Sequence, residues 1–361
     1  MIYPLLPIAI AYDAVTSIRN LLYDHGILVS QAYDLPVICI GNLAVGGTGK
    51  TPHTEYLVRL LQTNGYHVAV LSRGYKRKTK GFVMATECST AADIGDEPLQ
   101  LARKFPDLVV AVDEDRCDGI QRLVTGTATA GIDVILLDDA FQHRRVAAGL
   151  NILLTDSHRL YTRDYLLPAG RLRENRRGGR RADIVVVTKL DHELNDHDAY
   201  RYYEALDIRS NQDIYFTRFR YGNLYNKYKE IALADLEHYN VLLVTGIANP
   251  RLLERELSKY TQFSIMRYAD HHAFSDNDYT MMQREYEALG TDKPRIVVTT
   301  EKDMARLQPD GMAFGKEIYA LPIEVEVLHN EKDMFNQQIL DYVRTNSRNR
   351  TIPQAEDDKQ A

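Results

Sequence analysis

A glycine-rich segment between an apolar run and a helix-like run constrains this chain more than any other feature. The segment at 41–52 reads GNLAVGGTGKTP, follows the apolar run 37–40 and precedes the helix-like run 55–61. A strand, a glycine-rich turn and a helix in that order aim several backbone N–H groups and a helix N-terminus at one point. The pattern predicts a phosphate-binding loop in which Lys50 reaches the β/γ-phosphates and Thr51 ligates Mg²⁺.

The ligand that this loop predicts is a nucleoside triphosphate. Position 44 holds alanine where the general consensus has glycine, so a glycine-rich turn that binds no phosphate is the alternative. Pro52 favours the helix, because proline suits a first helical turn and fits a strand poorly. The residues expected to contact the nucleotide are Val45, Gly46, Gly47, Thr48, Gly49, Lys50 and Thr51.

Length and composition restrict the class of protein. The 361 residues suffice for two domains, and the 45% of hydrophobic residues can form a substantial core. The net charge of −6 argues against a nucleic-acid partner. The three cysteines lie far apart and form no CxxC pair, which argues against a disulfide framework or zinc site and fits a reducing cytoplasm.

The N-terminus predicts an amphipathic helix over residues 1–24. No stretch reaches the roughly 18–20 apolar residues of a spanning helix. The segment also lacks the basic region and cleavage site of a signal peptide. The sequence allows two interpretations of this segment: a helix packed on the body of the protein, or a helix lying in a membrane surface. The apolar residues that recur at steps of three and four are Leu5, Ile8, Tyr12, Val15, Ile18 and Leu22.

Fully apolar strands alternate with helices from residue 25 to 213. This pattern is typical of a P-loop NTPase-like α/β core, in which a parallel sheet carries helices on both faces and binds ligands at the carboxyl ends of its strands. After the loop, the expected strands are 68–71, 108–112, 134–137, 151–154 and 184–187.

A second, smaller α/β domain is expected over residues 214–345. It begins with a strand-like linker at 215–221, whose alternating aromatic and polar residues resemble an exposed strand. Further strands are expected at 241–244 and 296–298. The polar residues 346–361 lack an apolar pattern, so a disordered tail is expected there.

Two acidic residues follow four apolar residues, like the acidic end of a Walker B strand. Asp138 and Asp139 can hold Mg²⁺ there, directly or through water. An acidic residue after a strand is common, and the phosphate loop is what makes this pair informative. Gln142 and His143 keep polar groups at the same strand end, and a structural histidine is the alternative for His143.

The sequence GDEP at 95–98 places Asp96 and Glu97 at an expected helix start. A helix cap with an acidic first turn is one interpretation. The other is a general base that takes a proton from an attacking hydroxyl. The run 270–272 could assist with its histidines, although no spacing shows that Asp96 meets His271.

Arginine is dense between residues 171 and 181. A solvated loop is one explanation, and a site for a substrate or nucleotide phosphate or for anionic lipid headgroups is the other. A second basic run covers 76–80, and we expect an anion contact for at least one of the two. The arginines of the first run are Arg171, Arg173, Arg176, Arg177, Arg180 and Arg181.

Taken together, these motifs resemble those of the tetraacyldisaccharide 4′-kinases, the lipid A 4′-kinases of Gram-negative bacteria. The match runs in order from the phosphate loop almost to residue 307, and the loop of that family also lacks the first consensus glycine. The segments that carry the resemblance are GNLAVGGTGKTP (41–52), SRGY (72–75), GDEP (95–98), LLDDAFQHR (136–144), LLPAGRLRE (166–174), RADIVVVTK (181–189), TGIANP (245–250), ADHHAF (269–274) and TTEKDMARL (299–307).

The resemblance implies transfer of the ATP γ-phosphate to the 4′-hydroxyl of a tetraacyldisaccharide 1-phosphate, which forms lipid IVA. It implies ATP as a substrate and a base made of Asp96 with His271. The catalytic set is completed by Lys50, Asp138 and Asp139. The implied Mg²⁺ ligands are Thr51, Glu97, Asp138 and Asp139. Thr188 and Lys189 would lie near the adenine. The implied substrate-binding residues are Asn42, Arg73, Tyr75, Gln142, His143, Arg171 and Arg173.

An acceptor with four acyl chains implies work at a bilayer surface. The resemblance therefore favours the membrane interpretation of the N-terminal helix, with a peripheral, monotopic protein on the cytoplasmic face of the inner membrane. No nucleic acid and no obligate protein partner are expected. The sequence TKLD at 188–191 resembles a guanine-specificity loop and suggests a rival, a GTP-dependent switch. A membrane-anchored module without catalysis is a third possibility, which Lys50, Thr51 and Asp96 argue against.

Overall fold

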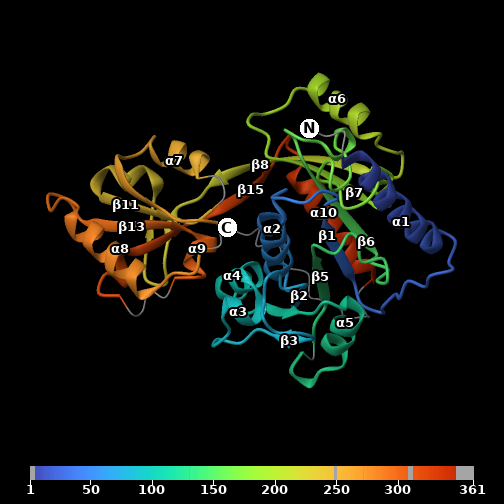
Figure 1. Cartoon of the computed structure of the whole chain (residues 1–361), viewed down its shortest axis with the longest axis horizontal. Helices are drawn as coiled ribbons and strands as arrows, with labels where there is room; N and C mark the ends of the chain where they lie inside the picture. The colour runs from blue at the N-terminus through green and yellow to red at the C-terminus, as the bar shows by residue number, and fades with distance from the viewer. Residues whose placement is uncertain (1–4, 130, 248–249, 271, 308–311, 347–361) are drawn as a thin grey trace, which may run out of the picture.

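Two α/β units make up the chain, and a long antiparallel strand pair runs between them (Figure 1). The pair consists of β8 (Asp213–Tyr221) and β15 (Ile323–Val327). The chain leaves the first unit through β8 and returns to it through β15. The computed structural model describes residues 5–129, 131–247, 250–270, 272–307 and 312–346.

The first unit is built on a nine-stranded sheet in the order β15-β8-β7-β6-β1-β5-β2-β4-β3. From β8 to β4 the neighbouring strands are parallel, and both edge strands pair antiparallel. This order confirms the predicted parallel sheet. The remaining strands are β1 (Val37–Gly41), β2 (Val68–Ser72), β3 (Val83–Met84), β4 (Val109–Val112), β5 (Val134–Asp138), β6 (Leu150–Asp156) and β7 (Ile184–Thr188).

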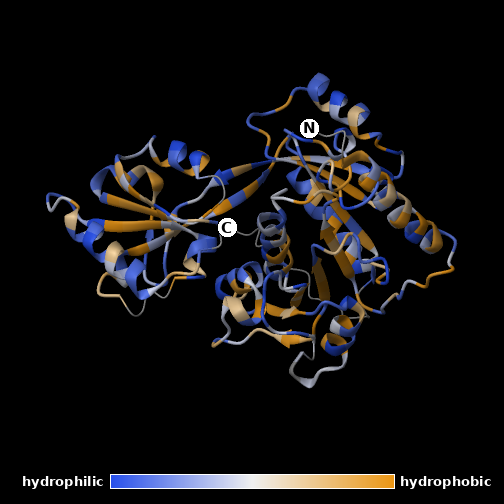
Figure 2. Ribbon diagram, viewed as in Figure 1, coloured by the Kyte–Doolittle hydropathy of each residue, from blue (hydrophilic) through white to orange (hydrophobic). Residues whose placement is uncertain are grey.

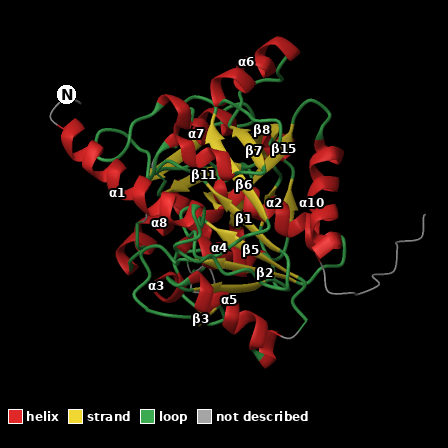
Figure 3. Ribbon diagram, turned by 90° about the vertical axis from the view of Figure 1, so that its right-hand side faces the viewer, coloured by secondary structure: helices red, strands yellow, loops and turns green. Residues whose placement is uncertain are grey.

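Helices cover both faces of this sheet, as the apolar strand runs predicted (Figure 3). One apolar layer joins the strands to α2, α4 and α10 through side chains such as Leu57, Leu101 and Phe335. The opposite layer holds Ile120 of α5 and Leu206 of α6. The helices of this unit are α1 (Leu6–Asp24), α2 (Lys50–Thr63), α3 (Ala91–Ile94), α4 (Asp96–Lys104), α5 (Arg116–Thr125), α6 (Asp196–Leu206) and α10 (Lys332–Asn346).

The second unit has its own six-stranded sheet in the order β10-β9-β14-β13-β11-β12. Its strands are among the most hydrophobic segments of the chain (Figure 2), and α7 and α8 pack on opposite apolar layers through Leu253 and Met282. The elements are β9 (Leu224–Tyr225), β10 (Glu230–Ile231), β11 (Asn240–Thr245), α7 (Arg251–Leu257), β12 (Phe263–Arg267), α8 (Asp276–Ala288), β13 (Arg295–Thr300), α9 (Glu301–Met304) and β14 (Ile318–Leu321).

The linker strand differs from the exposed strand expected at 215–221. Residues Ile214, Tyr215 and Phe216 of β8 are buried. The reason is that β8 lies inside the large sheet, parallel to β7 on one side and antiparallel to β15 on the other. Tyr215 and Phe216 therefore pack in the core of the first unit, whereas Tyr221 at the end of β8 packs against the core of the second unit.

The C-terminal helix also departs from the expected boundaries. The second domain was expected to extend to residue 345, but α10 packs on the first sheet. Phe335, Ile339 and Val343 are buried against side chains of that sheet and of α2, and Tyr56 of α2 donates a hydrogen bond to Asn336. An amphipathic helix does not reveal in its sequence which of two sheets it covers. The disordered tail was expected from residue 346, but Asn346 is the last residue of α10, and residues 347–361 lie outside the described part of the chain.

The N-terminal helix α1 lies at the outer edge of the first unit (Figure 1). Its inward side is largely polar: Asp13 accepts hydrogen bonds from Asn175, Asn20 donates to Glu174, and the Tyr12 hydroxyl donates to the backbone of Arg173. Most of its large apolar side chains point away from the protein. The exposed apolar residues of α1 are Ile8, Ile10, Tyr12, Val15, Ile18 and Leu21.

Candidate active site

The phosphate loop lies at the carboxyl end of β1, where the glycine-rich sequence predicted it. Gly49 adopts a left-handed conformation (φ +89°) just before α2 begins at Lys50. A Cβ on Gly49 would lie only 2.5 Å from the Phe219 ring of the linker strand. Glycine is therefore required both by the backbone conformation and by this close approach. The loop runs directly into the N-terminal end of α2 at Lys50. Backbone N–H groups of the loop and of this helix end are the groups that bind an anion in such a loop.

Buried hydrogen bonds fix the loop from beneath. The side chain of Asn42 is fully buried and donates to Thr48 Oγ1 at 2.7 Å. Thr188, at the end of β7, donates to the carbonyl oxygen of Thr48 at 2.9 Å. His53 of α2 lies 2.7 Å from the carbonyl oxygen of Gly49 and 3.0 Å from the Thr217 hydroxyl. Asn42, which the sequence suggested as a substrate contact, thus supports the loop.

Asp139 leaves the regular strand geometry where β5 ends. It has φ +50°, a conformation that a residue other than glycine rarely adopts and that is often found at functional sites. Its carboxylate accepts two hydrogen bonds from Arg173, at 2.8 and 2.9 Å, and lies 3.7 Å from Lys50 Nζ. Burial would raise the pKa of Asp139, but Lys50 and Arg173 hold it below its ordinary value. This group is an anion at neutral pH.

Asp138 is buried next to further negative charge. It accepts long hydrogen bonds of 3.4 Å from Thr54 and from Ser72. Burial, followed by the charges of Glu97 and Asp139, raises the pKa of Asp138 to about 7. Lys50 and Arg116 oppose this shift only in part. A carboxylate with this much uncompensated charge near it provides an oxygen ligand for a hard cation.

Helix α4 brings the second pair of carboxylates to the same strand ends. Asp96 and Glu97 form its first turn, after Gly95 in a φ +91° conformation. Glu97 is near enough to Asp138 to perturb its titration. Both interpretations of this pair, as a helix start and as site residues, are therefore compatible with its position. The expected partner His271 lies outside the described residues.

The neighbouring histidine of the second unit is already engaged. His272 Nε2 lies 3.0 Å from the carboxylate of Asp278 and stacks on the ring of Tyr268. Its backbone carbonyl oxygen accepts a hydrogen bond from Arg306. These contacts hold His272, within the ADHHAF segment, against side chains and backbone of the second unit.

Four of the residues expected to bind the acceptor substrate follow the ends of β2 and β5. Arg73 and Tyr75 follow β2 and are exposed, and the side chain of Tyr75 is 71% accessible. Gln142 donates to the carbonyl oxygen of Asn42 at 2.9 Å and so lies against the loop. Burial, then the charges of Arg116 and Arg73, lowers the pKa of His143 to about 4. The imidazole of His143 is therefore neutral at pH 7.

The two arginines at 171 and 173 border the loop. The backbone of Arg171 accepts a hydrogen bond from Val45 N, and its guanidinium lies 3.9 Å from where a Cβ on Gly46 would be. The guanidinium of Arg173 is bound to Asp139. Farther on, Lys189 lies 2.7 Å from Asp156. All these cations are close to strand ends, and Arg171 is turned toward the phosphate loop.

Sequence reasoning missed two buried charged residues. Arg116 is 1% exposed, donates to the carbonyl oxygen of Asp113 and is near enough to Asp138 to influence it. Its Nε has no partner among the described residues. Glu174 is fully buried and accepts hydrogen bonds from Arg181, Asn20 and Gln142. The signal for Arg116 was its place at the start of α5, in the segment that follows the end of β4. Glu174 had only its inclusion in a recognisable motif.

Several of the remaining arginines surround an open hollow of about 400 Å³. It lies between η3 (Tyr161–Arg163), η4 (Arg176–Arg181) and the end of α6. One carboxylate, Asp207, is part of its lining. The arginines that line the hollow are Arg163, Arg176, Arg177 and Arg180. This is a basic surface close to the inward side of α1, which contacts Asn175.

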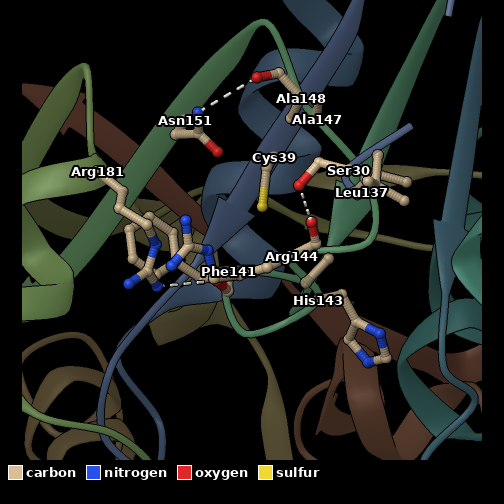
Figure 4. Close-up of a pocket in the computed structure, with 12 residues that line it drawn as sticks. Ser30, Cys39, Leu137, Phe141, His143, Arg144, Ala147, Ala148, Asn151 and Arg181 are labelled. Carbon is tan, nitrogen blue, oxygen red and sulfur yellow. Dashed lines mark hydrogen bonds between the residues drawn. The ribbon is translucent and has the colours of Figure 1, made fainter. Parts of the chain in front are cut away.

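A smaller cavity of about 150 Å³ lies next to the end of β5, where Leu137 and Ala140 line it (Figure 4). Cys39, Phe141 and Arg181 are among the residues that line it, and Arg181 covers the Phe141 ring. Burial raises the pKa of the Cys39 thiol to about 12. The thiol therefore stays protonated, as expected for a cysteine in a strand core.

Known proteins resemble this chain over nearly its whole length. The family model described as tetraacyldisaccharide-1-P 4′-kinase matches residues 1–344. The tetraacyldisaccharide 4′-kinase of Bacteroides fragilis (strain YCH46) is 50% identical, over 98% of this chain and 96% of its own length. That of Bacteroides thetaiotaomicron is 48% identical, over 99% and 97%. The crystal structure of LpxK from Aquifex aeolicus with ATP has a TM-score of 0.74 at 30% identity, over 95% of this chain and 99% of that one.

Proposed function

The chain belongs to the tetraacyldisaccharide 4′-kinase family, and we propose that it transfers the ATP γ-phosphate through the site around Lys50 and Asp138. The acceptor is the 4′-hydroxyl of a tetraacyldisaccharide 1-phosphate, and the product is lipid IVA. One observation carries this assignment. The phosphate loop, Asp138, Asp139 and the start of α4 come together at the carboxyl ends of the parallel strands.

Binding of ATP follows from the geometry of the loop. The loop amides and the N-terminus of α2 attract the phosphates, and Lys50 adds a charge next to Asp139. Arg171 lies on the open side of Gly46, where it can contact either nucleotide or acceptor phosphate. The solved relative contains ATP. In the TKLD sequence, Lys189 is paired with Asp156 and Asp191 lies 3.1 Å from His158 Nε2, so both charged groups of the motif already have partners within the protein.

The residues around Asp138 fit a bound Mg²⁺. Within the described residues, no three His, Cys, Asp or Glu side chains are grouped to hold a metal by themselves. Mg²⁺ commonly takes one or two carboxylates and completes its shell with phosphate oxygens and water. The residues that would hold the ion are Thr51, Glu97, Asp138 and Asp139. When bound, it would neutralise charge on the phosphates.

Asp96 is the proposed general base. The 4′-hydroxyl oxygen forms a bond to the γ-phosphorus, the bond from phosphorus to the bridging oxygen of ADP breaks, and the hydroxyl proton passes to Asp96. His271 is proposed to orient and support this carboxylate. Lys50 and the loop amides stabilise the charge of the transferring group.

The outward face of α1 supports peripheral membrane attachment. Because a largely polar side of this helix is turned toward the protein, its exposed apolar side chains, such as Ile8, Val15 and Ile18, have only solvent or a bilayer to contact. Within the described part of the chain, no helix is both long and apolar enough to cross a membrane. We infer that the protein lies on the cytoplasmic face of the inner membrane, with α1 in the headgroup region.

The product of the reaction tests this function. The protein is incubated with ATP, Mg²⁺ and tetraacyldisaccharide 1-phosphate in mixed micelles, and the lipid is analysed by mass spectrometry and ³¹P NMR. The proposal expects one added phosphate, on the 4′ oxygen. ATP consumption without phosphorylated lipid, or an equal rate with GTP, would contradict it.

A further inference from the structure

A buried lysine connects both site-bearing helices of the first unit to the second unit. Lys104, the last residue of α4, forms ion pairs with Glu55 of α2, at 2.5 Å, and with Glu301 at the start of α9. The side chains of Glu55, Lys104 and Glu301 are 5%, 10% and 8% exposed. We call this set the Glu55–Lys104–Glu301 bridge. In Figure 1, α9 lies at the edge of the second unit that faces α2 and α4.

Further contacts reinforce the bridge on each side. Gln100 of α4 donates to Glu55 at 2.7 Å, and the Tyr225 hydroxyl of the second sheet donates to Glu301 at 2.7 Å. Arg103 donates to the carbonyl oxygen of Ala305 at 2.6 Å. Ala305 also joins a small apolar cluster with first-unit side chains that include Leu99. The two units therefore meet through a packed, specific contact at this point.

The bridge joins the chemical groups through rigid elements. Helix α2 begins at Lys50, and α4 begins at Asp96. At a rise of 1.5 Å per residue, Glu55 is about 7.5 Å along α2 from Lys50, and Lys104 is about 12 Å along α4 from Asp96. A shift of Lys104 moves the whole of α4, because a helix of this length is stiff. Glu301 begins α9 directly after β13, so it is fixed to the second sheet.

The charge balance of the bridge is poor for simple stabilisation. Two buried carboxylates share one ammonium group, and burial together with the charge of Glu301 raises the pKa of Glu55 to about 7. Buried ion pairs often add little stability compared with apolar replacements, and in some proteins they fix one arrangement of the chain instead. The ion pairs of the bridge thus join α2, α4 and α9 at one buried point.

We propose that Lys104 is a positioning residue, which through Glu55 and Glu301 aligns the carboxylates of α4 with the phosphate loop while the second unit is docked. This inference rests on the proposed kinase function. A displacement of about 1 Å at reacting groups can lower a rate about 10²-fold, so a modest loosening of α4 is sufficient to slow transfer. The second unit thereby contributes to catalysis through a contact remote from the ADHHAF segment.

The test replaces one carboxylate without changing its size. Glu301→Gln keeps a hydrogen-bond partner for Tyr225 and leaves Lys104 paired with Glu55. We expect kcat to fall about 10-fold while the KM for ATP stays within about twofold, since the phosphate loop is untouched. Hydrogen exchange in residues 96–104 should increase, with no matching increase in α5. Glu256→Gln, which removes a carboxylate paired with Lys259 at 2.6 Å on α7, is the control and should keep the wild-type kcat.

A second variant separates position from stability. Lys104→Met removes both ion pairs, and Lys104→Met combined with Glu301→Gln should lower kcat no further than Lys104→Met alone, because both act through one contact. A kcat within twofold of wild type in Glu301→Gln, or additive losses in the double variant, would overturn the proposal. If wild-type protein itself transfers no phosphate to the lipid, the kinase function fails instead, and the two failures are thus distinguishable.

Discussion

Glutamine in place of three outward residues of α1 should release the protein from membranes without unfolding it. The residues are Ile8, Val15 and Ile18, which are 57%, 68% and 59% exposed. Full burial of such a side chain contributes about 1.5–3 kcal/mol, so the exposed fraction of each contributes about 1–2 kcal/mol on entering a bilayer. The three together account for about 3–5 kcal/mol. At about 1.4 kcal/mol per tenfold change, membrane partitioning should fall at least about 10²-fold.

The triple variant Ile8→Gln, Val15→Gln, Ile18→Gln can be assayed by co-sedimentation with phospholipid vesicles. Glutamine favours helices nearly as well as leucine, and the replaced side chains contact little protein, so the melting temperature should stay near that of wild type. The control is Leu252→Gln with Met334→Gln, two residues of similar exposure on α7 and α10. Triple-variant protein that pellets with vesicles as wild type does would refute the assignment of α1 as the membrane-contacting face.

Three further substitutions test the loop and its support. Lys50→Met should lower kcat at least about 10²-fold, measured by phosphate transfer, because it removes the charge at the start of α2. Gly49→Ala should lower the melting temperature and ATP affinity more than Gly65→Ala, measured by calorimetry: both have positive φ, but only at Gly49 would the new Cβ meet the Phe219 ring. Burial lowers the pKa of His53 from 6.5 to about 4, so its contribution to stability is lost as pH falls through that range, by up to about 1.4 kcal/mol per pH unit. In pH-dependent melting, His53→Gln should therefore lose less stability than wild type between pH 6.5 and 4, and an equal loss would contradict the burial argument.

Local patterns were enough to predict six parallel strands of the first sheet and the loop, but not the buried position of β8 or the edge strands β3 and β15. Each buried parallel strand is a short apolar run, and the loop combines glycines with Lys50 at a strand-to-helix junction. The Walker B-like strand was equally readable, because Asp138 ends a fully buried run. These features depend on residues that are neighbours in the chain, so sequence spacing describes them well.

Contacts between distant segments were not predictable in the same way. The carboxylate of Asp139 is paired with Arg173 and Lys50, which reach it from two other segments. Glu174 is buried because Arg181 and the N-terminal helix surround its charge, and nothing in its neighbours indicates this. For the same reason the sequence did not reveal which sheet α10 covers. A pairing of Asp96 with His271 likewise stays a prediction.

The most direct test of the proposed site compares phosphate transfer by wild type and by Asp96→Asn. γ-Labelled ATP and tetraacyldisaccharide 1-phosphate are supplied in mixed micelles, and Asp118→Asn, an exposed carboxylate in the first turn of α5, is the matched control. The account predicts a loss of at least about 10²-fold for Asp96→Asn with ATP binding retained, and wild-type transfer for Asp118→Asn. Transfer by Asp96→Asn within a few-fold of wild type would contradict Asp96 as the base and the arrangement of the site built around it.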